Sequence, residues 1–244
     1  MKHDAWFDTD ENKALLAICA RKLISNIGIG GIVWGVINIA IGVFAINAAM
    51  INAGILILGV LMLGTGVQAI RYPSLKVLLT ETAVTIFLFL WNVAMTVINF
   101  TVDGNPDPRG IILPLIIAVS FISQYWKLTY LKEQIASVPP EKIKATKNMC
   151  KTLVRQKVKD DPMLVETSDR KCRAQLMDGG AFFIQRDLMR AFVALKKDVQ
   201  VTVEKPGASR LKLVFNHPLG KLTYKFDRRN SDKLKAWLGV PVIA

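Results

Sequence analysis

Hydrophobic residues dominate the first half of the chain in four stretches, which short polar segments interrupt. The stretches occupy residues 23–46, 48–70, 75–100 and 110–130. A helix that crosses the hydrocarbon core of a membrane needs about 20 mostly apolar residues, and each stretch meets that length. The pattern therefore predicts a four-helix transmembrane domain over residues 23–131. Residues 1–22 are polar to amphipathic, which predicts a cytoplasmic segment that forms either an interfacial helix or a frayed terminus.

From residue 132 to residue 161 the apolar stretches give way to a basic connector, which the Pro139-Pro140 pair interrupts. Beyond the prolines, basic side chains recur at three- and four-residue spacing: Lys144, Lys147, Lys151 and Arg155. Ile143 and Cys150 fall on another face of the same helix. The connector therefore predicts an amphipathic helix with one cationic face.

The hydrophobic period changes to two in residues 162–244, where apolar and polar side chains alternate in several short runs. Turn signals separate the runs: Asp178-Gly179-Gly180, Pro206-Gly207 and Pro218 to Gly220. This alternation predicts about six antiparallel strands. The predicted core residues of this domain are Val201, Leu213, Phe215, Tyr224 and Trp237.

A short helix is predicted to close this β-rich domain. Asn230-Ser231 is a suitable N-cap, and Leu234, Trp237 and Leu238 follow at helical spacing. The strand order, the single terminal helix and its Trp237 resemble a pleckstrin-homology-like domain of the bacterial membrane-associated kind over residues 162–239. The resemblance implies a β-domain with one C-terminal helix, and the four-span region resembles no named family.

The net charge is divided unevenly along the chain. The first 126 residues contain seven basic and seven acidic residues, so the whole net charge of +13 lies in residues 127–244. Basic residues flank alternate ends of the spans: Arg21, Lys22, Arg71, Lys76, Lys127 and Lys132. Because short cytoplasmic loops are enriched in Lys and Arg, we expect both termini in the cytoplasm of a bacterial-type inner membrane. The Asn105-Pro106-Asp107-Pro108 stretch is then an exterior turn.

Glycines recur within the first two spans. They are Gly28, Gly31, Gly35, Gly42, Gly59 and Gly66. Small residues let helix backbones approach closely, which is a main route to helix packing in lipid. The pattern predicts that the first two spans pack against each other, or against a second copy in an oligomer.

Charged side chains within the spans are few, and Glu81 is the only acidic one. A carboxylate in hydrocarbon is costly, so we expect Glu81 to face protein or water. Lys76, Thr80 and Thr82 are close enough in sequence to satisfy it locally, which favours a structural role near the interface over a proton or ion path. Four amide side chains are candidates for interhelical hydrogen bonds: Asn38, Gln68, Asn92 and Asn99.

Catalytic motifs are absent from the sequence. It lacks an HExxH zinc motif, a phosphate-binding glycine loop with lysine, and a CxxC pair. Cys19, Cys150 and Cys172 are widely spaced and odd in number, which is typical of a reducing compartment. We therefore expect a protein that is not an enzyme and holds no cofactor or metal.

The basic tail has several possible partners. Clustered Lys and Arg residues beside a span attract anionic inner-leaflet lipid by about 1 kcal/mol each, and an acidic protein is a second partner class. Nucleic acid is disfavoured because no binding motif accompanies the charge, and part of the charge serves only to set topology. The residues expected to contact lipid or partner are Lys144, Lys147, Lys151, Arg155, Arg186, Arg190, Lys221, Lys225, Arg228 and Arg229.

These patterns together predict a membrane-anchored accessory or scaffold subunit. Its basic cytoplasmic domain is expected to dock a protein partner or anionic lipid, and its spans to associate with a partner or a second copy. The alternative is a small transporter or channel subunit that uses the four-helix bundle, in which case Glu81 and the span amides would line the path.

Overall fold

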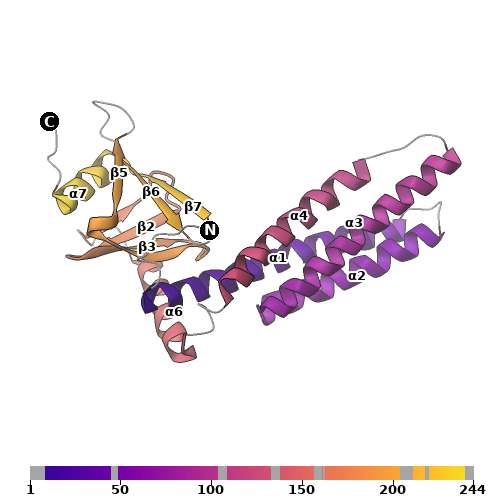
Figure 1. Ribbon diagram of the computed structural model, residues 1–244, viewed down its shortest axis with the longest axis horizontal. Coiled ribbons are helices and arrows are strands. Elements are labelled where there is room, and N and C mark those ends of the chain that lie inside the picture. Colours follow the sequence, from indigo (N-terminus) through magenta and orange to yellow (C-terminus); the bar gives the residue numbers. More distant parts are fainter. Residues whose placement is uncertain are drawn as a thin grey trace. The chain divides into compact units, whose positions relative to one another are not determined.

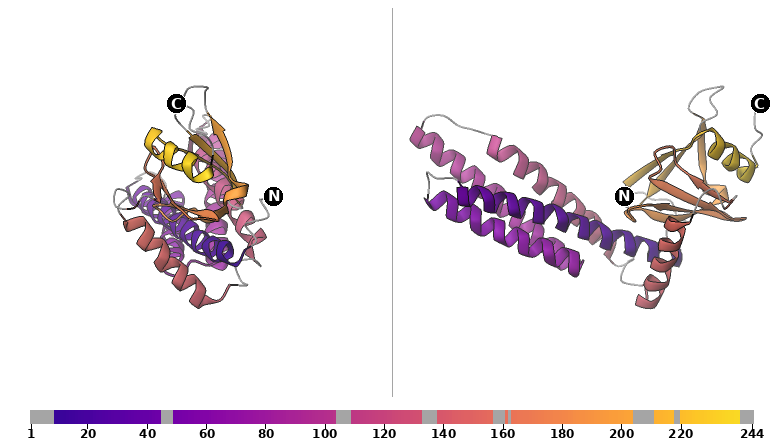
Figure 2. Two further views of the ribbon diagram at one scale, coloured as in Figure 1. Left: turned by 90° about the vertical axis from the view of Figure 1, so that its left-hand side faces the viewer. Right: turned by 180° about the vertical axis from the view of Figure 1, so that it is seen from behind.

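The structure is a computed structural model, and it divides the chain into two compact units. It describes residues 9–44, 49–103, 109–132, 138–156, 161, 163–203, 211–217 and 220–239. The helical unit consists of Arg21–Tyr130. The β unit combines Met1–Ala20 with Leu131–Ala244. Figure 1 labels the helices and most of the strands, and Figure 2 shows the same ribbon in two further views with the same colours.

Long apolar helices make up the helical unit (Figure 1). They are the later part of α1 (Asp10–Phe44), α2 (Ala49–Arg71), α3 (Leu75–Asp103) and α4 (Arg109–Tyr130). Three described segments are long and apolar enough to cross a membrane: Asp10–Phe44, Ala53–Arg71 and Leu75–Ile98. The prediction of several membrane-crossing helices is confirmed to this extent. Within the unit, α3 packs against both α2 and α4.

Seven strands form two antiparallel sheets in the described part of the β unit (Figure 1). The first sheet has the order β1-β2-β3-β4, with bounds Leu164–Glu166, Cys172–Leu176, Gly180–Gln185 and Ala191–Leu195. The second has the order β5-β6-β7, with bounds Gln200–Val203, Leu211–His217 and Gly220–Lys225, and the 3-10 helix η2 (Lys196–Asp198) precedes it. The predicted β-rich C-terminal region is confirmed. It has more strands than the alternation indicated, because the three residues of β1 are too few to show a period.

An aromatic cluster joins the two sheets. Phe183 and Phe192 come from the first sheet, and Phe215 and Tyr224 come from the second. Their ring centroids lie 4.9–6.3 Å apart, within the range in which aromatic pairs add to the stability of a core. All four rings are buried in one core to which both sheets contribute, so the cluster holds the two sheets together.

Three of the five predicted core residues are buried in the core that contains this aromatic cluster. Leu213, Phe215 and Tyr224 are buried, whereas Trp237 is half-buried at its edge and donates from Nε1 to Met177 O at 2.6 Å. The side chain of Val201 lies outside the described residues. Trp237 therefore covers the core from outside, because its polar nitrogen reaches a backbone acceptor at the surface.

Helix α7 (Arg228–Leu238) closes the β unit, but it begins earlier than predicted. Asp227 is its N-cap and accepts a hydrogen bond from Asn230 N at 2.8 Å. The predicted caps instead lie in the buried first turn: Asn230 Nδ2 donates to Glu166 O, and Ser231 Oγ accepts from the Leu211 amide. These two side chains form hydrogen bonds with backbone groups of β1 and β6. Local sequence spacing does not indicate such distant partners.

The first part of α1 belongs to the β unit, where the sequence indicated a separate interfacial segment. Asn12 Nδ2 donates to Val193 O at 2.9 Å, and the Val193 amide donates to Asn12 Oδ1 at 2.7 Å. Further along the helix, the Ala191 amide donates to Cys19 Sγ at 3.1 Å. Because β4 is the edge of its sheet, these side chains satisfy backbone groups that another strand would otherwise pair. The amphipathic pattern of this segment therefore reflects packing on a sheet edge.

Candidate functional site

Helix α6 (Pro140–Arg155) carries the candidate lipid-binding face. It begins after Pro139, with Pro140 in the first turn, where the missing N–H of proline costs least. Its buried residues are Ile143, Cys150 and Leu153. The cationic face consists of four side chains that are all exposed: Lys144, Lys147, Lys151 and Arg155. The structure therefore brings these four sequence-predicted residues together on one solvent-facing surface.

The C-terminal end of α6 is fixed to the first sheet by Arg173 on β2. The Arg173 guanidinium donates from Nη1 to Val154 O at 2.6 Å and to Gln156 O at 2.5 Å. Its Nε donates to Glu166 Oε1 at 3.0 Å. A cation at a helix C-terminus satisfies carbonyls that have no partner within the helix. Arg173 thus holds the cationic face of α6 in a fixed orientation on the β unit, a role that sequence reasoning missed.

Two of the predicted contact residues are already engaged within the domain. Arg186 Nη2 forms an ion pair with Glu166 Oε1 at 2.5 Å. Arg190 is half-buried and donates from Nη1 to Met189 O at 2.7 Å. The structure therefore shows contacts of both arginines within the β unit.

The remaining predicted cations are exposed on β7 and the first turn of α7. They are Lys221, Lys225, Arg228 and Arg229. Lys212 on β6 lies directly opposite Lys225 in the strand register. Like charges in such a cross-strand pair are destabilising, so this sheet face concentrates positive charge at some cost in stability. Together, Lys212 and the four exposed cations form what we call the β7–α7 surface. Lys212 is not among the predicted contact residues, and its place in this surface follows from its pairing with Lys225 in the strand register.

Glycines of α1 and α2 meet backbone to backbone. A Cβ atom on Gly28 would lie 2.6 Å from Gly66 O, and one on Gly35 would lie 2.7 Å from Gly59 O. The converse distances, from Gly66 to Gly28 O and from Gly59 to Gly35 O, are 2.6 and 2.9 Å. No side chain fits at such approaches. Gly42 is buried, and Gly31 faces a side chain of α3 rather than the α2 backbone.

Glu81 lies fully buried in the helical unit, and its partner comes from another helix. Its Oε2 is within hydrogen-bond distance of Thr65 Oγ1 on α2. The residues expected to satisfy it locally do otherwise: Thr80 Oγ1 donates to Lys76 O at 3.1 Å, and Thr82 Oγ1 donates to Leu78 O at 2.7 Å. Helical threonines bond readily to the carbonyl four residues back, which takes both hydroxyls away from Glu81.

Two amide side chains of the spans also bond to the carbonyl four residues back in their own helix. Asn38 Nδ2 donates to Trp34 O at 2.8 Å, and Asn92 Nδ2 donates to Leu88 O at 2.7 Å, each within its own helix. Gln68 is exposed, and the side chain of Asn99 lies outside the described residues. Both hydrogen bonds lie within a single helix, so these two amides do not form a polar path between helices.

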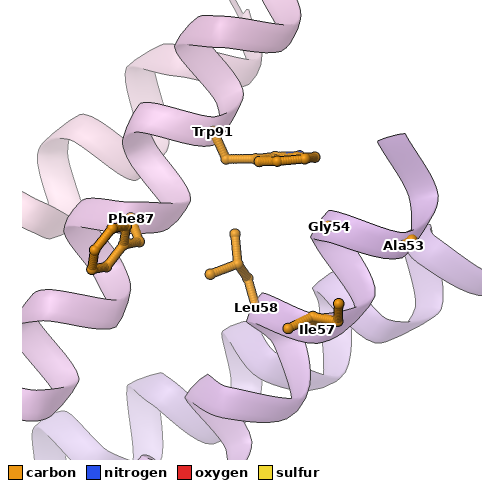
Figure 3. A pocket seen from close by; sticks show the side chains of 6 residues that line it. All are labelled: Ala53, Gly54, Ile57, Leu58, Phe87 and Trp91. Carbon is orange, nitrogen blue, oxygen red and sulfur yellow. The ribbon is translucent and has the colours of Figure 1, made fainter. Parts of the chain in front are cut away.

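A cavity of about 430 Å³ opens between α2 and α3 (Figure 3). Its lining is apolar and consists of Ala53, Gly54, Ile57, Leu58, Phe87 and Trp91. The Trp91 ring extends toward Gly54, where any side chain would collide with it. A lining of this kind offers no acid, base or nucleophile, so the cavity has none of the groups that catalysis requires.

The described residues offer little other reactive chemistry. No three His, Cys, Asp or Glu side chains among them could hold a metal ion together. Burial raises the pKa of the Cys150 thiol to about 11, and burial raises the pKa of Cys172 as well. Both thiols therefore stay protonated near neutral pH and are poor nucleophiles.

A comparison with family models, curated proteins and solved structures finds no match to this chain. The class of the protein therefore rests on its own helices and sheets. The three long apolar helices among its described residues are compatible with a multi-pass membrane protein, and a β-rich domain of two sheets accompanies them.

Proposed function

We propose that the protein is a non-enzymatic, membrane-anchored accessory or scaffold subunit. Its β unit docks on anionic lipid through the cationic face of α6 and on an acidic protein partner through the β7–α7 surface. The observation that carries this proposal is the arrangement of α6, in which Ile143, Cys150 and Leu153 are buried while the four clustered cations are exposed. The two antiparallel sheets and the closing helix α7 support a pleckstrin-homology-like domain as the docking module.

The anchor in this proposal consists of four spans. Helix α4 has 22 residues, which is long enough to cross the hydrocarbon core together with the three long apolar helices. An even number of spans returns the chain to its starting side, and the basic flanks place that side in the cytoplasm. The β unit, which draws on both ends of the chain, then lies on the cytoplasmic face.

Cysteine labelling tests this topology. Single cysteines introduced at Asn47 and Asp103 are expected to react with a membrane-impermeant thiol reagent in intact cells, whereas one at Pro73 reacts only after permeabilisation. Buried Cys19, Cys150 and Cys172 give a low background. Labelling of the Pro73 position alone in intact cells would reverse the orientation.

Tethering strengthens the attraction of α6 for the bilayer. Helix α4 ends at Tyr130 and α6 begins at Pro140, so the cationic face follows the proposed last span closely. Binding of a tethered group acts at a high effective concentration, so a weak attraction suffices. Four basic residues near an anionic surface contribute about 1 kcal/mol each, and salt screens them over about 8 Å at physiological ionic strength.

The lipid contact is tested with the full-length protein in nanodiscs. An environment-sensitive fluorophore is attached through Asn148→Cys, an exposed position between Lys147 and Lys151. We expect a shift toward an apolar environment with anionic lipid but not with neutral lipid. The shift should disappear in high salt and when the four cations of α6 become glutamine.

The matched control carries the fluorophore at Asp178→Cys, an exposed turn position between β2 and β3. Its emission should not depend on the charge of the lipid. Equal spectra of the Asn148→Cys label in anionic and neutral nanodiscs would remove the lipid contact and leave a protein partner as the ligand of α6.

A further inference from the structure

Glu81 brings three helices together through one carboxyl group. Its Oε2 meets Thr65 on α2, and its Oε1 occupies the space that a side chain at Gly31 on α1 would fill. The Glu81 side chain itself belongs to α3 and is fully buried. Its Oε1 has no hydrogen-bond partner in the described part of the chain. The carboxyl is therefore enclosed, with one oxygen bonded to Thr65 and the other unbonded beside Gly31.

The number of protons at Thr65 limits which hydrogen bonds can form in this contact. A threonine hydroxyl has one proton and can also accept. Thr65 Oγ1 lies 2.9 Å from Leu61 O, the carbonyl four residues back, to which helical threonines commonly donate. If the hydroxyl proton is directed at Leu61 O, the short contact between Thr65 Oγ1 and Glu81 Oε2 needs a proton from the carboxyl. A protonated carboxyl therefore satisfies both contacts of Thr65 at once, whereas an ionised carboxylate would compete with Leu61 O for the single hydroxyl proton.

The surrounding charges favour the same state. No basic side chain that the structure describes in the helical unit forms an ion pair with Glu81. These side chains are Arg21 and Lys22 on α1, Arg71 on α2, Lys76 on α3 and Lys127 on α4. An ionised carboxylate with an unbonded oxygen in an apolar interior costs many kcal/mol, so such a group takes up a proton instead. In hydrocarbon no water is present to offset that cost.

We propose that Glu81 is a proton-binding site, which holds a proton at neutral pH and donates it through Oε2 to Thr65 Oγ1. The bound proton allows α3 to pack against α1 and α2, and Gly31 leaves the room for the carboxyl. Loss of the proton would place an uncompensated charge between the three helices and loosen their packing. This inference does not depend on lipid or partner binding by the β unit.

Infrared spectroscopy of the full-length protein in nanodiscs tests the proposal. The wild-type spectrum at neutral pH minus that of Glu81→Gln should contain the carbonyl band of a protonated carboxyl group, shifted in heavy water. Thr65→Val keeps the shape of the side chain and removes the acceptor. We expect the band to persist in that variant but move toward the position of a free acid.

A second measurement applies to the wild type alone, since Glu81 is the only glutamate within residues 21–130. Glutamate labelled with carbon-13 at its carboxyl should give one resonance of a protonated acid among those of ionised side chains. Ionised bands for Glu81, or thermal stability that rises specifically with added sodium, would overturn the proposal and indicate a cation site. Absence of any protonated glutamate signal in both measurements would also overturn it.

Discussion

Gly35→Leu is expected to prevent α1 and α2 from packing and to unfold the helical unit at a much lower temperature. A Cβ at this position would lie 2.7 Å from both Gly59 O and Leu63 N, which are backbone atoms that cannot rotate away. Overpacking usually costs about 1–3 kcal/mol and more where the neighbours cannot yield. We therefore expect a loss of about 3 kcal/mol or more, measured as thermal unfolding in mild detergent.

Gly30→Leu is the matched control for this experiment. Gly30 lies on the same helix, and a Cβ placed there would meet nothing within 4 Å. The two variants add the same side chain and have the same helix propensity, so they differ only in what the new side chain meets. Equal unfolding temperatures for Gly30→Leu and Gly35→Leu would show that this glycine contact does not hold α1 against α2.

Asn12→Ala is expected to destabilise the β unit through the edge of its first sheet. The side chain of Asn12 satisfies both the amide and the carbonyl of Val193, and alanine can satisfy neither. A buried backbone group that loses its partner costs about 1–3 kcal/mol, so the two together cost about 2–6 kcal/mol. The exposed edge of β4 would also become available for pairing with other chains, which promotes aggregation.

Hydrogen exchange of the Val193 amide in the full-length protein reports this contact directly. The amide should exchange faster in Asn12→Ala and stay protected in Glu11→Ala, since Glu11 is an exposed neighbour on the same helix. Asn12→Asp should protect the amide but still lose stability, because a carboxylate accepts from Val193 N and cannot donate to Val193 O. Unchanged exchange in Asn12→Ala would mean that α1 does not cap β4.

Most helix and strand positions follow from the sequence, because an element with one buried side repeats its apolar residues with the period of that element. The helices α2, α3 and α4 begin and end within a few residues of the predicted stretches, since charged residues and prolines mark their ends. The exposed cations of α6 and the buried Phe215 and Tyr224 follow from spacing alone. The buried side of each element can therefore be predicted from the residues of that element alone.

Contacts between elements distant in the chain were not predictable in this way. The predicted cap of α7 is wrong because Asn230 and Ser231 bond to backbone groups of β1 and β6. The partner of Arg186, Glu166, is 20 residues away in the sequence, so local spacing does not indicate their ion pair. The contact between Thr65 and Glu81 joins two helices, and the local residue pattern around Glu81 does not indicate it.

The sequence by itself determined that this protein has long apolar helices, a basic amphipathic helix and a β-rich tail, because hydrophobic periods and charge record burial locally. Only the tertiary structure decided that α1 begins inside the β unit, with Asn12 and Cys19 on the edge of β4. Only the tertiary structure likewise set the carboxyl of Glu81 between Thr65 and Gly31. Both arrangements join single polar side chains on elements that are far apart in the chain. A single polar residue forms no repeating pattern, so its partner cannot be inferred from hydrophobic periodicity.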